Sequence, residues 1–112
     1  MLTGVPADDD QRTLVAEAGR VLRPGGLLYV SDCLLNDDAR NLARYEAERA
    51  RDAPRGPWGT FALDDGAVFR HHDRAWLNEL FADFDEEEFV PFVATTMNGN
   101  RTSAFQAFLR RR

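Results

Sequence analysis

The chain has 112 residues, 14 basic and 19 acidic side chains, a net charge of −5 and 44% hydrophobic residues. This length allows one small domain with a single core, and the acidic balance disfavours a nucleic-acid-binding protein, which would show a basic face. No apolar run approaches the roughly 20 residues of a membrane-spanning helix, and no signal-peptide pattern opens the sequence. The single cysteine, Cys33, excludes an internal disulfide framework, so we expect a cytoplasmic protein.

The first third of the sequence predicts the second half of a βαβ unit. Residues 1–5 are apolar, and we interpret them as the end of a strand. Apolar residues at helical spacing predict a helix over 8–23, capped by an aspartate from 8–10 and ended by a Pro-Gly-Gly stop at 24–26. The apolar run 27–30 does not alternate, which is typical of a strand buried on both faces of a parallel sheet.

Residues 36–70 are different in character and predict an insert. Asn36 is a candidate cap for a surface helix over 37–52, whose apolar residues are mostly small. A loop rich in proline and glycine surrounds Trp58, and two short runs at 60–63 and 67–69 predict a hairpin.

The last third predicts a helix and two strands. Asp73 is a candidate cap for a helix with an apolar stripe that reaches residue 84, and an acidic turn is expected at 85–88. Pro91 predicts that the following strand, 89–96, lies at a sheet edge. A hairpin turn at Asn98-Gly99 then leads into an antiparallel strand over 102–110.

The segment 18–32 resembles the helix–loop–strand segment of class I S-adenosylmethionine-dependent methyltransferases. In that family a helix ends in Leu-Arg/Lys-Pro-Gly-Gly, as at 22–26 here, and the fifth sheet strand follows and often ends in Asp, as at Asp32. The elements after residue 72 look like the family's next helix, edge strand and terminal strand. The resemblance implies one α/β domain over 1–112: a partial Rossmann-like methyltransferase sheet with a helix–strand unit, a lid-like α-helical and loop insert at 36–70, a helix and a C-terminal antiparallel β-hairpin.

The family's cofactor site lies mainly in its first half, where a glycine-rich turn lets the backbone approach the ligand. This sequence has no G-x-G-x-x-G motif. We therefore expect the C-terminal portion of a methyltransferase that acts on a small-molecule acceptor, with S-adenosylmethionine as cofactor, and that does not bind this cofactor alone. The alternative is a non-catalytic interaction module. In that case the strand at 27–30 has an exposed edge, through which the chain forms a homodimer or associates with a separate N-terminal half.

Ligands of open α/β sheets bind beyond the carboxyl ends of the strands, and this rule selects three groups of residues. The first, Thr3, Gly4 and Val5, is the candidate cofactor-binding segment. The second is Asp32, which either orients the acceptor as a catalytic residue or caps the next turn. The third contains Thr96 and Asn98, which are candidate substrate-binding residues if their strand runs parallel to that at 27–30.

Three further side chains are candidates from the insert and its border. His71 is a candidate catalytic base, because imidazole titrates near neutral pH, and its neighbour His72 is expected to point to the opposite face; the alternative for both is a polar loop end. Tyr45 and Trp58 either cover the substrate or pack the insert against the sheet. We expect no metal site, since no cysteine or carboxylate stands at ligand spacing.

Overall fold

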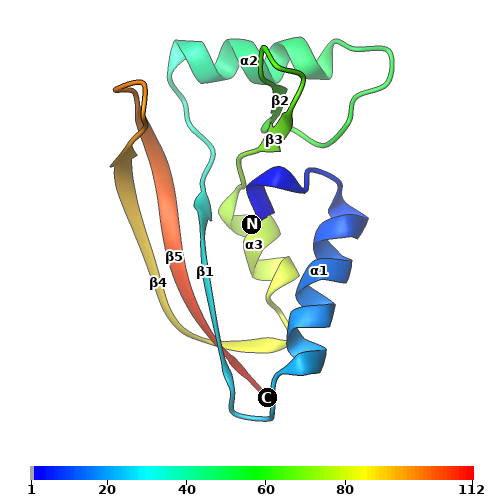
Figure 1. The fold of residues 1–112 in the computed structure, drawn as a ribbon, viewed down its shortest axis with the longest axis vertical. Coiled ribbons are helices and arrows are strands. Elements are labelled where there is room, and N and C mark those ends of the chain that lie inside the picture. The colour runs from blue at the N-terminus through cyan, green and yellow to red at the C-terminus, as the bar shows by residue number, and fades with distance from the viewer. Residues whose placement is uncertain (1) are drawn as a thin grey trace.

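In residues 2–112, which the computed structural model describes, three strands form the main sheet in the order β1-β5-β4 (Figure 1). β1 (Leu27–Cys33) and β4 (Phe84–Thr95) both pair antiparallel with β5 (Arg101–Arg111), so β1 and β4 run in the same direction. β4 is an edge strand, as Pro91 predicts. Gly99, with a φ of 79°, turns the chain from β4 into β5 and confirms the expected hairpin.

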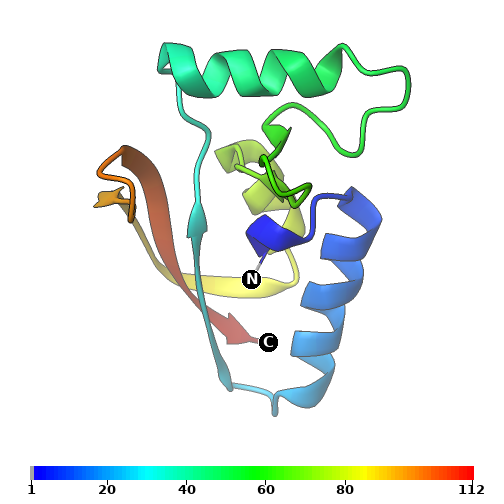
Figure 2. The same cartoon turned by 45° about the horizontal axis from the view of Figure 1, so that its top comes forward.

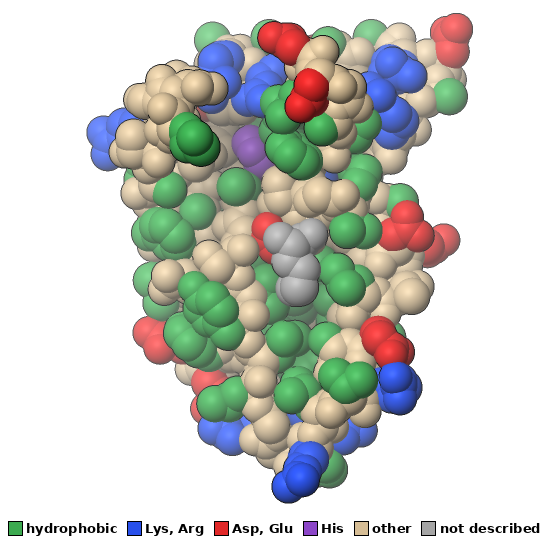
Figure 3. Space-filling model, in the orientation of Figure 1, with side chains coloured by type: hydrophobic (Ala, Val, Ile, Leu, Met, Phe, Trp, Pro, Cys, Tyr) green, Lys and Arg blue, Asp and Glu red, His purple; other side chains and the backbone are tan. Residues whose placement is uncertain are grey.

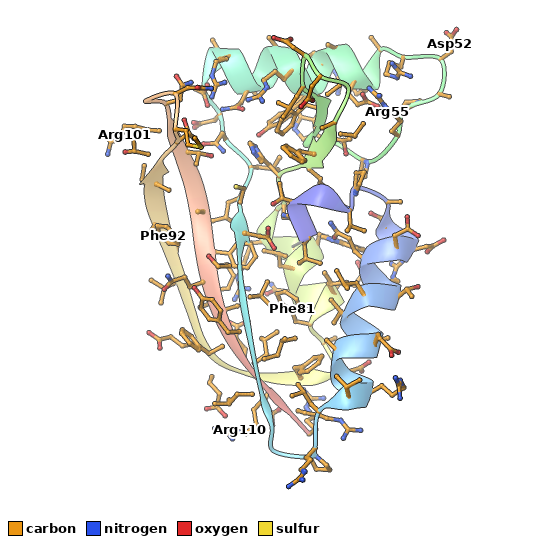
Figure 4. The ribbon with its side chains drawn as sticks, in the orientation of Figure 1. Asp52, Arg55, Phe81, Phe92, Arg101 and Arg110 are labelled. Carbon is orange, nitrogen blue, oxygen red and sulfur yellow. The ribbon has the colours of Figure 1, made fainter. Side chains whose placement is uncertain are left out.

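Two helices cover one face of this sheet. α1 (Asp8–Val21) and α3 (Arg74–Leu80) lie on the same side of it in both ribbon views (Figures 1 and 2). Alternate residues of β5 point to this side, because side chains of a strand alternate between its faces. The core joins them to the helices and contains Val15, Leu77, Leu80, Phe81, Phe105, Ala107 and Leu109. In Figure 4, Phe81 lies between the helices and the sheet, whereas Phe92 lies away from them on β4.

The prediction that β1 is buried on both faces is wrong. Val30 faces the helices and is buried, but Leu27 and Tyr29 point to the other face and are 55% and 50% exposed. No element of residues 2–112 covers that face, so this side of the strand lacks the layer that its apolar composition indicated.

The interpretation of residues 1–5 as a strand end is also wrong where the structure describes them. Residues Leu2–Gly4 form a short 3-10 helix, η1, and residue 1 lies outside the described residues. The reason is a partner distant in sequence: the Asp32 carboxylate accepts hydrogen bonds from the backbone N–H groups of Leu2 (2.9 Å) and Thr3 (3.2 Å), which in a strand would be donated to a neighbouring strand.

One of the three expected helix caps is correct, and the other two are not. Asp73 caps α3 and accepts a hydrogen bond from the Trp76 N–H at 2.6 Å, as predicted. The aspartates at 8–10 stand inside the first turn of α1, where the helix dipole favours them, and the cap position is Ala7. The insert helix α2 (Ala39–Arg49) is capped by Asp38, so the expectation for Asn36 is wrong.

The acidic turn expected at 85–88 is wrong, because β4 begins at Phe84 and α3 ends at Leu80. The stretch pairs with β5, and arginines distant in sequence form ion pairs with three of its carboxylates. The pairs are Arg74–Glu86 at 2.6 Å, Arg110–Glu87 at 2.5 Å and Arg112–Asp85 at 2.8 Å. A register shift between Glu86 and Glu88 marks a β-bulge in the same stretch.

The insert folds as a helix over a small hairpin. β2 (Thr60–Ala62) and β3 (Val68–Arg70) pair antiparallel, which confirms the predicted hairpin. α2 lies across one end of the molecule, next to the tip of the β4–β5 hairpin (Figure 1). Among the described residues, no helix is long and apolar enough to span a membrane.

Candidate functional site

A hollow of about 340 Å³ lies where the insert meets the tip of the β4–β5 hairpin. Figure 3 shows histidine surface at the bottom of a depression in this part of the molecule. The hollow is lined by residues of η1, the end of β1, α2, the β2–β3 hairpin and the β4–β5 tip: Thr3, Cys33, Arg40, Arg44, Phe61, Leu63, Phe69, His71, Thr96, Met97, Asn98, Asn100 and Thr102.

Four of the residues predicted from the sequence meet in this hollow. They are Thr3, His71, Thr96 and Asn98, which come from three distant parts of the chain. Asp32, Tyr45, Trp58, Gly4 and Val5 are not among its lining residues. The β1 and β4 directions explain the convergence, because strands that run the same way end at the same edge of the sheet.

His71 is a buried lining residue, and a hydrogen bond holds its ring in place. Only 6% of it is exposed, and its Nδ1 lies 2.6 Å from the Tyr45 hydroxyl. Burial lowers the pKa of His71 to about 4, and the charges of Arg44, His72 and Arg40 add to this effect. The imidazole is therefore neutral near pH 7.

Two neighbours of His71 Nδ1 assign the ring proton to the other nitrogen. The Asn36 side-chain NH₂, which can only donate, lies 3.5 Å from Nδ1, and the Tyr45 hydroxyl, which accepts the Asn36 backbone N–H at 3.2 Å, lies 2.6 Å from Nδ1 and donates to it. With Nδ1 as the acceptor, the neutral ring carries its hydrogen on Nε2. Burial raises the pKa of Tyr45, so the phenol also stays protonated.

His72 has a different environment from its neighbour. Its Nδ1 lies 2.9 Å from the Cys33 carbonyl, and its Nε2 lies 2.9 Å from Gln11 Nε2. The neutral ring donates from Nδ1 and accepts at Nε2, because Gln11 Nε2 and the carbonyl leave no other pairing. Burial lowers the pKa of His72 as well. The two rings thus bond to different partners, and His72 connects β1 to α1 away from the hollow.

Asp32 connects the end of β1 to the N-terminal segment. Besides two backbone N–H groups, its carboxylate accepts the Thr3 hydroxyl at 2.7 Å. These donors orient η1 against β1. The catalytic role expected for Asp32 stays a prediction, and its contacts give it a positioning role.

Tyr45 and Trp58 belong to the aromatic cluster inside the insert. Tyr45 is 1% exposed and meets Trp58 edge-on, with ring centroids 5.4 Å apart. The guanidinium of Arg49 lies over the Trp58 ring at 4.7 Å. Tyr45 therefore acts on the hollow through His71, and direct substrate contact by either aromatic stays a prediction.

Sequence reasoning missed two arginines of the hollow. Arg40 and Arg44 stand four residues apart on α2, a spacing that places both on one helix face. Arg44 stacks over the Phe61 ring at 3.9 Å and donates to the Asn41 side chain at 2.9 Å. The four-residue spacing of the two arginines is visible in the sequence, but an arginine-rich helix is typical of a solvent-exposed surface.

Gly59 determines how closely the insert approaches His71. Its φ is 105°, a conformation that favours glycine, and its carbonyl accepts the His71 backbone N–H at 2.9 Å. A Cβ at this position would lie 2.3 Å from the His71 carbonyl oxygen. A larger residue would thus push the insert loop away from His71.

The residues predicted to bind the methyl donor differ in their relation to the hollow. Of these three residues, Thr3 lines the hollow, and its hydroxyl is already donated to Asp32. No group of three or more metal-binding side chains stands together in residues 2–112. The donor-binding role expected for residues 3–5 stays a prediction.

No protein-family model and no curated protein sequence matches the chain. The fold does match solved structures. A SAM-dependent methyltransferase from Methanosarcina mazei superposes with a TM-score of 0.82 and 22% identity, over 98% of this chain and 55% of that one. A structure described for the conversion of a disulfide bond into a thioacetal group during echinomycin biosynthesis superposes with a TM-score of 0.55 and 18% identity, over 96% and 44%. The fold is thus a methyltransferase-like α/β fold, and this chain spans about half the length of both structures.

Proposed function

We propose that the chain is the C-terminal, acceptor-side portion of an S-adenosylmethionine-dependent methyltransferase that acts on a small molecule. The superposition of nearly the whole chain on about half of the Methanosarcina mazei methyltransferase is the observation that carries this proposal. The sequence motif at 22–26 and the strand that follows it support the same assignment.

The hollow beside His71 is the acceptor site in this proposal. It lies beyond the ends of β1 and β4, where ligands of α/β sheets bind, and its volume is that of a small-molecule pocket. The insert at 36–70 serves as a lid, since α2 and the β2–β3 hairpin supply one wall. Catalysis in such a site consists mainly of holding the acceptor in line with the methyl group.

The methyl donor binds mainly outside these residues, because the chain has no glycine-rich turn. Calorimetric titration of this chain with S-adenosylmethionine tests whether the donor site lies outside these residues. We expect no measurable heat of binding from the chain alone. Micromolar affinity would overturn the assignment of the donor site to another part of the protein.

A second function is favoured by the free edge of β1. In the described chain, β1 pairs with β5 on one side, and the single bridge Leu34–His72 is the pairing on its other side. Exposed Leu27 and Tyr29 lie next to this edge. Unpaired strand edges with apolar side chains associate with other chains, so we propose a homodimer or assembly with a separate N-terminal half through β1.

Light scattering coupled to size-exclusion chromatography tests this association. We expect Leu27→Lys to shift the chain toward the monomer, because it places a charge beside the pairing edge. Val21→Lys is the matched control, since Val21 is 66% exposed but lies on α1. A parent chain that is monomeric at micromolar concentration would contradict self-association through β1.

A further inference from the structure

The hollow beside His71 has an unusual charge for this molecule. The chain carries 19 acidic and 14 basic side chains, yet the side chains lining the hollow include Arg40, Arg44 and no carboxylate. Among the described residues, neither arginine forms an ion pair with an acidic side chain. Cations without a carboxylate partner, placed in a concave site, attract an anion.

The nearby carboxylates do not bond to these arginines, although the charge of Asp38 acts on both of them through space. Asp38 is occupied by the cap of α2, where it accepts from the backbone and side-chain nitrogens of Asn41 at 3.2 and 2.7 Å. Asp64 borders an adjoining, smaller hollow together with both arginines, without bonding to either. The guanidinium groups therefore keep free N–H donors.

His71 adds a neutral donor to these cations. Its Nδ1 is held by Tyr45, and its Nε2 has no partner in the described part of the chain. The Nε2 atom is not fully enclosed, and His71 lines the hollow, so a ligand in the hollow reaches this nitrogen. Because Tyr45 donates to Nδ1, the group presented at Nε2 is an N–H. His71 thus serves as a hydrogen-bond donor in this site, and the role of catalytic base expected from the sequence stays a prediction.

The hollow also has an apolar part. Phe61, Leu63 and Phe69 come from the hairpin of the insert, and Met97 comes from the tip of the β4–β5 hairpin. The Arg44 guanidinium lies over the Phe61 ring at 3.9 Å and donates to the Asn41 side chain, and these two contacts hold its planar fork in place. A fixed fork beside an aromatic wall suits a carboxylate attached to an aromatic or aliphatic body.

We propose that this hollow binds a small organic acid, whose carboxylate is held by Arg44, Arg40 and the His71 Nε2–H and whose apolar body packs against Phe61 and Phe69. The proposal rests on the function proposed above, since it names the chemical class of the methyl acceptor. The neutral state of His71 supports it, because a neutral ring donates to the anion without titrating near pH 7.

NMR titration of the 112-residue chain without any methyl donor tests this proposal. The probes are 3-phenylpropionate, the neutral 3-phenylpropanamide and inorganic phosphate, and the readouts are backbone shifts around the hollow and the ring nitrogens of His71. We expect the carboxylate to bind about tenfold more tightly than the amide, because a charge-assisted contact is lost. The free ring should show its hydrogen on Nε2.

Variants locate the binding site. Arg44→Gln should weaken 3-phenylpropionate binding about tenfold. Arg49→Gln, on the same helix but outside the hollow, should leave it within about twofold. If Arg44→Gln does not fold, the exposed Arg40→Gln carries the same expectation. Equal affinity for acid and amide, unchanged binding by the arginine variants, or equally tight binding of inorganic phosphate would overturn the organic-acid site. These outcomes leave the donor titration unaffected, so the two proposals fail separately.

Discussion

The Tyr45 hydroxyl lies 2.6 Å from Nδ1 of His71 and joins the insert helix to the residue that borders the hollow. The same hydroxyl accepts the Asn36 N–H, and the Asn36 side chain in turn donates to the Leu34 carbonyl at 3.0 Å and to the Thr102 hydroxyl at 3.2 Å. This network connects β1, α2 and β5 at one end of the sheet. It explains why the insert holds a fixed position over the hollow.

Replacement of Tyr45 by phenylalanine should destabilise the fold by about 1–3 kcal/mol, because the partly buried Asn36 N–H loses its acceptor and the buried His71 Nδ1 loses its short hydrogen bond. The free energy of unfolding in urea measures this effect. Tyr29→Phe is a matched control, since the Tyr29 ring is half exposed, and it should change stability by less than about 0.5 kcal/mol. Equal effects of the two variants would show that the Tyr45 hydroxyl does not organise the network.

Stability should fall as the pH drops below the ordinary pKa of histidine. The folded protein holds the pKa of His71 at about 4, whereas the unfolded chain protonates at 6.5. Between these values the unfolded state binds the additional proton, so the free energy of unfolding falls by up to about 1.4 kcal/mol per pH unit. Urea unfolding at several pH values measures this slope.

The variant His71→Gln isolates the contribution of this one group. Glutamine does not titrate, while His72 and the carboxylates titrate in both proteins. Between pH 6.5 and 5, the variant's free energy of unfolding should depend less steeply on pH. We expect the difference in slope to be up to about 1.4 kcal/mol per pH unit, which corresponds to one proton. Identical slopes would mean that His71 is protonated in the folded protein.

Glycine should be required at position 59 for a steric reason beyond its backbone angle. Gly59 and Gly66 both have positive φ, but a Cβ at Gly66 has open space around it. Gly66→Ala should therefore cost about 1 kcal/mol of backbone strain, and Gly59→Ala should cost about 2–4 kcal/mol because its Cβ meets the His71 carbonyl. Thermal unfolding of both variants compares them, and equal costs would contradict the close approach at Gly59.

Removal of the Asp32 charge should release the N-terminal segment. In Asp32→Asn, one acceptor oxygen becomes an NH₂ group that faces N–H donors, so the fold should lose about 1–3 kcal/mol. Amide hydrogen exchange at Leu2 and Thr3 should accelerate more than exchange in the rest of the chain. Asp52→Asn, in an exposed loop, is the control (Figure 4). Unchanged exchange at Leu2 and Thr3 would rule out Asp32 as their anchor.

Local signals in the sequence located most of the elements. The Asp73 cap, the Asn98-Gly99 turn and the hairpin around residues 64–66 were correct, because each depends on neighbouring residues alone. The errors came from partners distant in sequence. The acidic stretch 85–88 lies in a strand that pairs with β5, and arginines at 74, 110 and 112 bond to three of its carboxylates; no local pattern contains that information.

The site was predicted in part for a similar reason. Thr96 and Asn98 were selected by their place after a strand and His71 by its imidazole chemistry, and the three do meet in one hollow. Arg44 and Phe61 were missed, because only the packing of α2 on the β2–β3 hairpin brings them together beside the hollow. Chain pattern alone does not specify which face of a polar helix borders a cavity.

The most direct test of the acceptor-side assignment joins this chain to the part of the Methanosarcina mazei methyltransferase that lies outside the matched 55%. The fusion is titrated with S-adenosylmethionine in a calorimeter, after cooperative unfolding has shown that it is folded. We predict micromolar binding by the fusion and none by this chain alone. A folded fusion that does not bind the donor, or a chain that binds it alone with the same affinity, would contradict the assignment.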